Sequence, residues 1–200
     1  VSSHKRIYHR LFNFINVVFK RTGSLKFIIK NSEFISDLPK EFTPGNYLTI
    51  GFRFSNLWRK ESNNNREQIN RIINQIRLFS KLDIVILSDE LGTRKCKEYI
   101  KNNKYISSIK FSKDYGTSFI EDGAILINSR SYLQFKAGGL GAFALFSEVP
   151  YLIFSEYNHE LKFSRNNMCA WAKNNQIYIN SKELGLFIKF ISLKKNMLFF

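Results

Sequence analysis

The sequence has few cysteines, and it contains no long uninterrupted run of apolar residues. Its two cysteines, Cys96 and Cys169, are far apart among 200 residues and support neither a disulfide framework nor a zinc site. Two unreacted thiols in a reducing compartment are the simpler interpretation. No apolar run approaches the ~20 residues that a bilayer-spanning helix needs, and no secretory signal peptide opens the chain. We therefore expect a cytoplasmic protein.

Histidines are also scarce, and their positions do not suggest a metal site. His4, His9 and His159 share no spacing typical of metal ligands, so we expect neither a metal nor a cofactor. His159 has Glu156 and Glu160 nearby and is a candidate general base. A histidine in a surface loop is the simpler interpretation.

Acidic residues are outnumbered by basic ones, with 16 Asp and Glu against 31 Lys and Arg and a net charge of +15. This balance predicts attraction to anions, which include nucleic acid, acidic lipid surfaces and phosphorylated small molecules. A coding bias toward Lys, Asn, Ile and Phe explains the same composition without any binding role. No RNA-recognition, zinc-finger or helix-turn-helix pattern occurs, so we do not expect a nucleic-acid partner.

Apolar residues make up 44% of the chain, which is enough to bury a sizeable core in one domain or two small ones. The chain begins with valine, so we expect it to be a piece of a longer protein. We assign residues 1–45 to an N-terminal helix and linker, which form the end of a preceding domain if one exists, and residues 46–200 to a second domain. Within the first segment, His4–Thr22 has an apolar stripe flanked by Lys and Arg. This helix either packs on a core or makes peripheral contact with the inner face of a membrane.

From Tyr47 onward, strand patterns alternate with helix patterns. Strands are expected at Tyr47–Ser55, Asp83–Asp89, Tyr105–Ser112, Ser131–Lys136, Pro150–Ser155 and Gln176–Asn180. Helices are expected at Arg66–Leu82, Glu90–Asn103, Leu140–Glu148 and Ser181–Lys195, the last of them capped by its serine, while Ser118–Ser129 fits either state. This order predicts an α/β fold with a Rossmann-like, doubly wound, mostly parallel sheet and helices on both faces.

The stretch KAGGLGAFALFSEVPYLIF, Lys136–Phe154, concentrates glycine between an expected strand and an expected helix. The glycines are Gly138, Gly139 and Gly141. A turn at the carboxyl end of a parallel strand is where open α/β sheets bind ligands, and glycine lets an anion approach the main chain. With Lys136 adding charge, the turn is a candidate site for a phosphate or diphosphate. The alternatives are a tight packing turn or one long helix over Ser131–Ser147, and the Gly-Lys-Ser/Thr ending of a P-loop is absent.

Other polar residues follow the expected strands at the same edge. Arg53 can make a bidentate contact with a phosphate, or it can be an exposed arginine without a role. Ser88, Asp89 and Glu90 end the strand that begins at Asp83, and they can accept hydrogen bonds from a nucleoside or sugar. Asp89 can equally cap the helix that follows it.

The stretch Tyr47–Ser155 resembles the C-terminal, nucleotide-sugar-binding half of GT-B-type glycosyltransferases, especially bacterial surface-polysaccharide and heptosyltransferase-like enzymes. The resemblance is carried by LTIGFRFS, by IVILSDE and by FIEDGAILINSRSYLQFKAGGLGAFALFSEVPYLIF. It implies transfer of a sugar from a nucleoside-diphosphate sugar to a glycan acceptor without a metal, with the diphosphate held at the glycine turn. Relatives of the heptosyltransferase type usually have Asp-Ser-Gly-Pro at that turn, where this chain has Lys-Ala-Gly-Gly. No catalytic residue is assigned.

The alternative hypothesis is a non-enzymatic, basic α/β module that binds nucleic acid or an anionic membrane surface. Its support is the net charge of +15.

Overall fold

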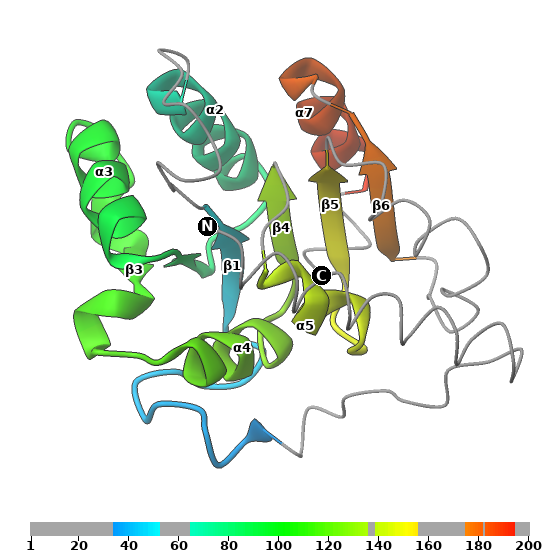
Figure 1. The fold of residues 1–200 in the computed structure, drawn as a ribbon. Coiled ribbons are helices and arrows are strands. Elements are labelled where there is room, and N and C mark those ends of the chain that lie inside the picture. Colours follow the sequence, from blue (N-terminus) through cyan, green and yellow to red (C-terminus); the bar gives the residue numbers. More distant parts are fainter. Residues whose placement is uncertain (1–33, 53–64, 136–138, 156–174, 182, 195–200) are drawn as a thin grey trace, which may run out of the picture.

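The computed structural model describes residues 34–52, 65–135, 139–155, 175–181 and 183–194 (Figure 1). Several predictions fall outside these ranges. They include the helix at His4–Thr22, all three histidines, Cys169, Arg53, Lys136 and Gly138.

The described residues form one six-stranded parallel sheet with the order β3-β2-β1-β4-β5-β6. The strands are β1 (Tyr47–Gly51), β2 (Asp83–Leu87), β3 (Ile109–Phe111), β4 (Tyr132–Phe135), β5 (Tyr151–Ser155) and β6 (Gln176–Asn180). The chain builds outward from β1 to β3 and then returns to place β4 on the other side of β1. This is the strand order of a doubly wound Rossmann-like sheet, and the order reverses between β1 and β4. The predicted fold class is confirmed.

Helices cover both faces of the sheet (Figure 1). On one face lie α2 (Asn65–Arg77), α3 (Glu90–Ile100) and α7 (Leu184–Leu193), and on the other lie α4 (Phe119–Ile127) and α5 (Gly141–Leu145). Successive strand residues alternate between two cores, as the period of a strand requires. Leu48 and Ile50 belong to the first core, and Tyr47 belongs to the second. Burial on both faces explains why β2 reads as an almost continuous apolar run.

The helix α2 confirms the clearest periodicity in the sequence. Ile69, Ile72, Ile73 and Ile76 are buried in the core, as their spacing predicts. The helix ends at Arg77 rather than at Leu82. The Arg77 guanidinium donates hydrogen bonds to the carbonyls of Leu82 and Ser108, so it holds the chain that leaves the helix.

The ambiguous stretch Ser118–Ser129 is helical because a capping box begins it. The Ser118 Oγ accepts a hydrogen bond from the Glu121 N–H at 3.2 Å, and the Glu121 carboxylate accepts one from the Ser118 N–H at 2.7 Å. These two bonds satisfy main-chain donors that a helix start leaves unpaired. The helix α4 is buried from Asp122 onward, so its apolar residues show no one-sided stripe in the sequence.

Other predicted element ends also differ from the structure, three of them clearly. Only Ile109–Phe111 of Tyr105–Ser112 is strand, because Ile106–Ser108 forms a 3-10 turn before it. The helix α5 has five residues instead of the nine expected. Ser181 does not cap α7, since Glu183 holds the N-cap position and the Ser181 hydroxyl instead accepts from the Glu183 N–H at 3.0 Å.

Candidate functional site

A cavity of about 230 Å³ opens at the carboxyl ends of β1 and β2 and beside β4. It lies where the strand order reverses, which is the place where open α/β sheets bind their ligands. Its lining consists of Gly51, Phe52, Leu87, Ser88, Asp89, Lys113, Phe119, Asp122, Tyr132, Gln134, Gly139 and Leu140. The cavity therefore gathers residues from β1, β2, β4, α4 and the glycine turn.

Tyr132 and Gln134 of β4 contribute polar groups to the cavity wall. The Tyr132 hydroxyl donates to the Gln134 Oε1 at 2.6 Å, and both side chains are almost completely buried. A Cβ atom at Gly51 would lie 2.2 Å from the Tyr132 hydroxyl oxygen, so any larger residue at position 51 would require the Tyr132 ring to move. A Cβ at Gly141 would lie 3.0 Å from the Gln134 Oε1. Two glycines thus permit the close packing around this hydrogen-bonded pair.

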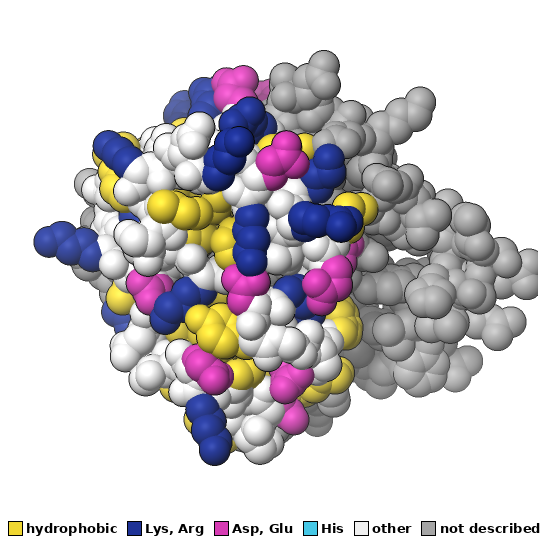
Figure 2. Space-filling view, turned by 90° about the vertical axis from the view of Figure 1, so that its left-hand side faces the viewer, with side chains coloured by type: hydrophobic (Ala, Val, Ile, Leu, Met, Phe, Trp, Pro, Cys, Tyr) yellow, Lys and Arg dark blue, Asp and Glu magenta, His cyan; other side chains and the backbone are white. Residues whose placement is uncertain are grey.

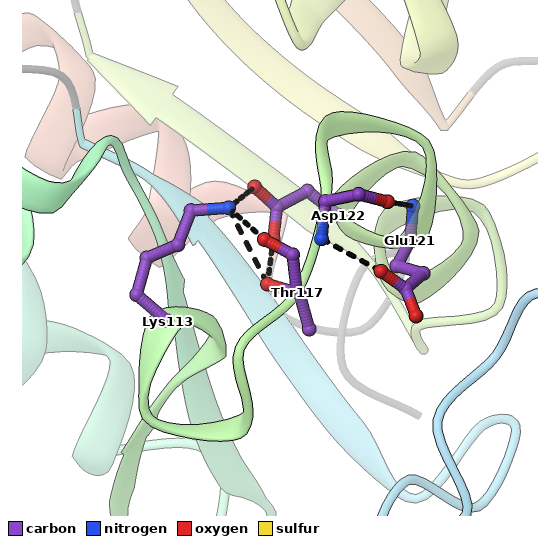
Figure 3. Close-up of polar contacts among 5 residues, drawn as sticks. Lys113, Thr117, Glu121 and Asp122 are labelled. Carbon is purple, nitrogen blue, oxygen red and sulfur yellow. Dashed lines mark hydrogen bonds and ion pairs between the residues drawn. The ribbon is translucent and has the colours of Figure 1, made fainter.

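A buried ion pair joins the segment after β3 to the first turn of α4 (Figure 3). The Lys113 Nζ donates to the Asp122 Oδ2 at 2.7 Å and to the Thr117 carbonyl at 2.5 Å. The Thr117 hydroxyl donates to the other Asp122 oxygen at 2.7 Å. The side chains of Lys113 and Asp122 are only 11% and 4% exposed, so solvent screens this pair weakly. The pair places a balanced positive and negative charge beside the cavity.

Ser88 and Asp89 lie at the cavity, as the sequence predicts, but they differ in what they contact. The Ser88 hydroxyl is buried and finds no hydrogen-bond partner among the residues that the structure describes. The Asp89 Oδ1 accepts from the Gly92 N–H at 2.6 Å and caps α3, so the capping alternative is confirmed. Glu90 is exposed in the first turn of α3 and does not line the cavity.

The glycine turn reaches the cavity through its described part. Gly139 and Leu140 line it, and Gly141 begins α5. The turn thus separates a strand from a helix, and the alternative of one helix over Ser131–Ser147 was wrong. Lys136 and Gly138 lie outside the described residues, and so does Arg53, which follows the cavity residue Phe52.

Sequence reasoning missed Lys113, Asp122, Tyr132 and Gln134 as lining residues. A signal existed for Lys113, because it stands two residues after β3 and so follows a strand at the carboxyl edge. No comparable signal marks Asp122, which reaches the cavity from a helix. Tyr132 and Gln134 lie within a strand. Side chains of a strand alternate between the two faces of the sheet, and this alternation does not show which face holds a cavity.

Groups outside the cavity give weaker functional signals. Cys96 is buried, and burial raises the pKa of its thiol to about 12, as expected of an unreactive cysteine. Within the described ranges, no group of three or more His, Cys, Asp and Glu side chains is arranged to hold a metal ion. Likewise, none of the described helices is long and apolar enough to span a bilayer.

Basic side chains are not gathered into one patch on the face that Figure 2 shows. Lys and Arg are interspersed there with Asp and Glu. Two ion pairs illustrate the mixing, Lys97 with Asp114 and Lys110 with Asp83. This distribution differs from the clustered stripe typical of nucleic-acid-binding surfaces.

No protein-family model and no curated protein sequence matches the chain. Among solved structures, the UDP-N-acetylglucosamine 2-epimerase from Rickettsia bellii is similar, with a TM-score of 0.48 and 17% sequence identity over 83% of this chain. The similarity covers 50% of the epimerase chain, so this chain spans about half of its length.

Proposed function

We propose that this chain is the donor-binding half of a GT-B-type glycosyltransferase. It would transfer a sugar from a nucleoside-diphosphate sugar to a glycan acceptor. The observation that carries the proposal is the cavity at the reversal of strand order, where the glycine turn meets the ends of β1 and β2. The resemblance of Tyr47–Ser155 to these enzymes supports the same assignment.

The proposed chemistry is electrostatic stabilisation of the leaving diphosphate. The main-chain N–H groups of Gly139 and its neighbours would bind the phosphate oxygens, which can approach a glycine closely because it has no Cβ. Arg53 and Lys136 follow the described residues Phe52 and Phe135 directly in sequence, and they would add positive charge at the same edge. Cationic side chains placed in this way would neutralise the charge that develops as the glycosidic bond to phosphate breaks. The catalytic base stays unassigned.

The acceptor and the place of action are parts of the same proposal. A glycan acceptor follows from the resemblance to surface-polysaccharide enzymes. The basic stretch His4–Thr22 would then bring the enzyme to the inner face of the membrane.

Isothermal titration of the chain with a panel of nucleoside-diphosphate sugars tests the proposal. Gly139→Asp places a carboxylate at the turn and should weaken binding by about tenfold or more through charge repulsion. Gly185→Asp is the matched control, because Gly185 is exposed in α7 and a Cβ there would meet nothing within 4 Å. Failure of every donor to bind, or equal binding by the two variants, would contradict the proposal.

The rival function has one observation in its favour, the net charge of +15. Titration of the chain with short duplex DNA at low and at moderate salt tests the rival function directly. Binding through many phosphate contacts falls steeply as salt increases, whereas binding at a preformed diphosphate site falls much less. Tight, strongly salt-dependent DNA binding without donor binding would favour the rival.

A further inference from the structure

The helices α2 and α3 end at the edge of the sheet opposite the cavity. Parallel strands all begin at one edge, so a helix that connects two of them must return to that edge. The connections 78–82 and 101–108 therefore lead from the ends of α2 and α3 to the first residues of β2 and β3. We call this edge the amino edge, and neither connection contributes a residue to the cavity lining.

Side-chain hydrogen bonds hold three helix ends close together at this edge. From the last residue of α2, the Arg77 guanidinium donates to the Ser108 carbonyl at 2.9 Å and keeps the connection into β3 beside α2. From the last turn of the same helix, the Gln75 Nε2 donates to the Ser192 Oγ, in the last turn of α7, at 2.7 Å. The end of α7 therefore lies at the amino edge as well.

Exposed aliphatic and basic side chains share the amino edge. Leu78 is 69% exposed, Leu193 is 66% exposed and Ile106 is 39% exposed. A single exposed aliphatic side chain is ordinary, but three of them on adjacent helix ends and connections call for an explanation. We define the amino-edge surface by these residues and the exposed lysines of the two connections: Leu78, Lys81, Lys101, Lys104, Ile106 and Leu193.

The amino-edge surface is positively charged. The connections 78–82 and 101–108 contain three lysines and no acidic residue. None of these lysines forms an ion pair within the described part of the chain. The acidic residues closest to the connections in sequence are Asp83, which pairs with Lys110 at 2.9 Å, and Glu98. The surface therefore suits an anionic partner.

We propose that the amino-edge surface docks on an anionic lipid bilayer, with its lysines among the head groups and its aliphatic side chains at the boundary with the acyl chains. Lysines are attracted to anionic head groups, and exposed aliphatic side chains gain free energy by leaving water. This docking rests on the membrane contact that the proposed function includes, and it assigns that contact to a face of the described domain. The cavity, at the opposite edge, stays open to a soluble donor.

A bilayer explains this surface better than nucleic acid does. Proteins that bind single-stranded nucleic acid combine basic residues with aromatic side chains on which bases stack. The exposed apolar side chains of the amino-edge surface are aliphatic. The two aromatic residues of the connections, Phe79 and Tyr105, are half-buried, and the Lys104 ammonium already lies over the Tyr105 ring, 4.9 Å from its centroid.

Flotation of the full chain with lipid vesicles tests the proposal. We expect binding to vesicles of phosphatidylcholine mixed with phosphatidylglycerol, and little binding to phosphatidylcholine alone. Leu78→Ser combined with Leu193→Ser should weaken binding to the anionic vesicles by about tenfold, because two side chains no longer leave water. The matched control is Ile35→Ser combined with Ile120→Ser. These side chains are 55% and 48% exposed, and Ile120 belongs to α4, on the other face of the sheet.

A second pair of variants examines the charge. Lys81→Gln combined with Lys101→Gln should weaken binding to the anionic vesicles by roughly ten- to thirtyfold. Arg66→Gln combined with Arg94→Gln removes the same charge from exposed residues nearer the starts of α2 and α3, so it is the matched control and should have a much smaller effect. All four variants change exposed side chains, and circular dichroism should show the native fold.

The possible failures are distinguishable. If the native chain does not bind anionic vesicles, or binds both kinds of vesicle equally, the docking proposal is wrong, whereas titration with the donor decides the enzymatic part of the proposed function separately. If the native chain binds but the amino-edge variants bind no more weakly than their controls, the membrane contact lies elsewhere and only the docking proposal fails. If the lysine variant weakens binding of duplex DNA while the leucine variant leaves vesicle binding unchanged, the surface binds nucleic acid and the proposal is refuted.

Discussion

Lys113 and Asp122 form a buried ion pair in which each member depends on the other. Their side chains are buried beside the cavity and are joined at 2.7 Å, with Thr117 satisfying the second carboxylate oxygen. Removing one member leaves the other as a buried charge without compensation. Such a charge is far more costly than the pair is favourable.

We predict that Lys113→Met lowers the free energy of unfolding by about 3–5 kcal/mol. Adding Asp122→Leu should recover a large part of that loss, because the uncompensated carboxylate is then gone. Urea denaturation of the native chain, the single variant and the double variant measures both effects. Equal stability of the two variants would show that the pair is not buried as described.

A second prediction concerns Gly51, whose missing Cβ leaves room for the Tyr132 hydroxyl. Gly51→Ala should destabilise the fold by roughly 1–3 kcal/mol, since the added methyl would overlap the hydroxyl oxygen. In the Tyr132→Phe background the same substitution should cost less, because the nearest remaining ring atom is 3.0 Å from the Cβ position. Thermal unfolding of the four chains gives the coupling energy. A coupling of zero would refute the proposed contact.

For single residues, the sequence predicted some of those that line the cavity and not others. Ser88, Asp89 and Gly139 were found because each follows a strand at the carboxyl edge. Asp122 was not predicted, because its contact with Lys113 depends on the turn between the two residues. Gly116 has a positive φ of 68° there, and no local pattern reveals how far that turn folds back.

Among the elements, α4 depends most clearly on its first turn. Ser118→Ala removes the hydroxyl that accepts from the Glu121 N–H, so we expect a loss of about 1 kcal/mol in the free energy of unfolding. Chemical denaturation measures it. Ser107→Ala is a control on an exposed residue of a 3-10 turn and should have little effect. Equal losses in the two variants would contradict the capping role.

The same capping box predicts a pH dependence. The hydrogen bond from the Ser118 N–H, with that from its hydroxyl, lowers the pKa of Glu121. Because the folded-state pKa is below the unfolded one of about 4.3, this contribution is fully present above that pH and is lost as the pH falls through the folded value. The stability advantage over Glu121→Gln should therefore be constant near neutrality and shrink in acid. An advantage that grows in acid would contradict the assigned bonds.

Element types were easier to predict than element ends. The isoleucine spacing of α2 and the apolar residues of β2 and β6 were enough to predict the type of each element, because each pattern extends over its whole element. The ends of α5 and α7 were missed because tertiary packing sets them. Val149, four residues after the end of α5, is buried in the core beneath α4 and α5.

For the whole molecule, the alternation of strands and helices was enough to predict the doubly wound sheet. Short connections and right-handed crossovers leave few other topologies for such an order. That topology in turn fixes the edge at which ligands bind, so the glycine turn and the residue after β2 were expected to meet. The walls of the cavity were not predictable to the same degree, because α4 was ambiguous in the sequence.

The most direct test of the account is to map donor binding on the chain by two-dimensional ¹H–¹⁵N NMR. During titration with a nucleoside-diphosphate sugar, we predict that the largest amide shifts occur at Phe52, Ser88, Gly139 and Leu140, which surround the cavity. Amides of α7, on the opposite face of the sheet, should shift little. Shifts centred on α7 or spread evenly over the surface, or no shifts at all, would contradict the account.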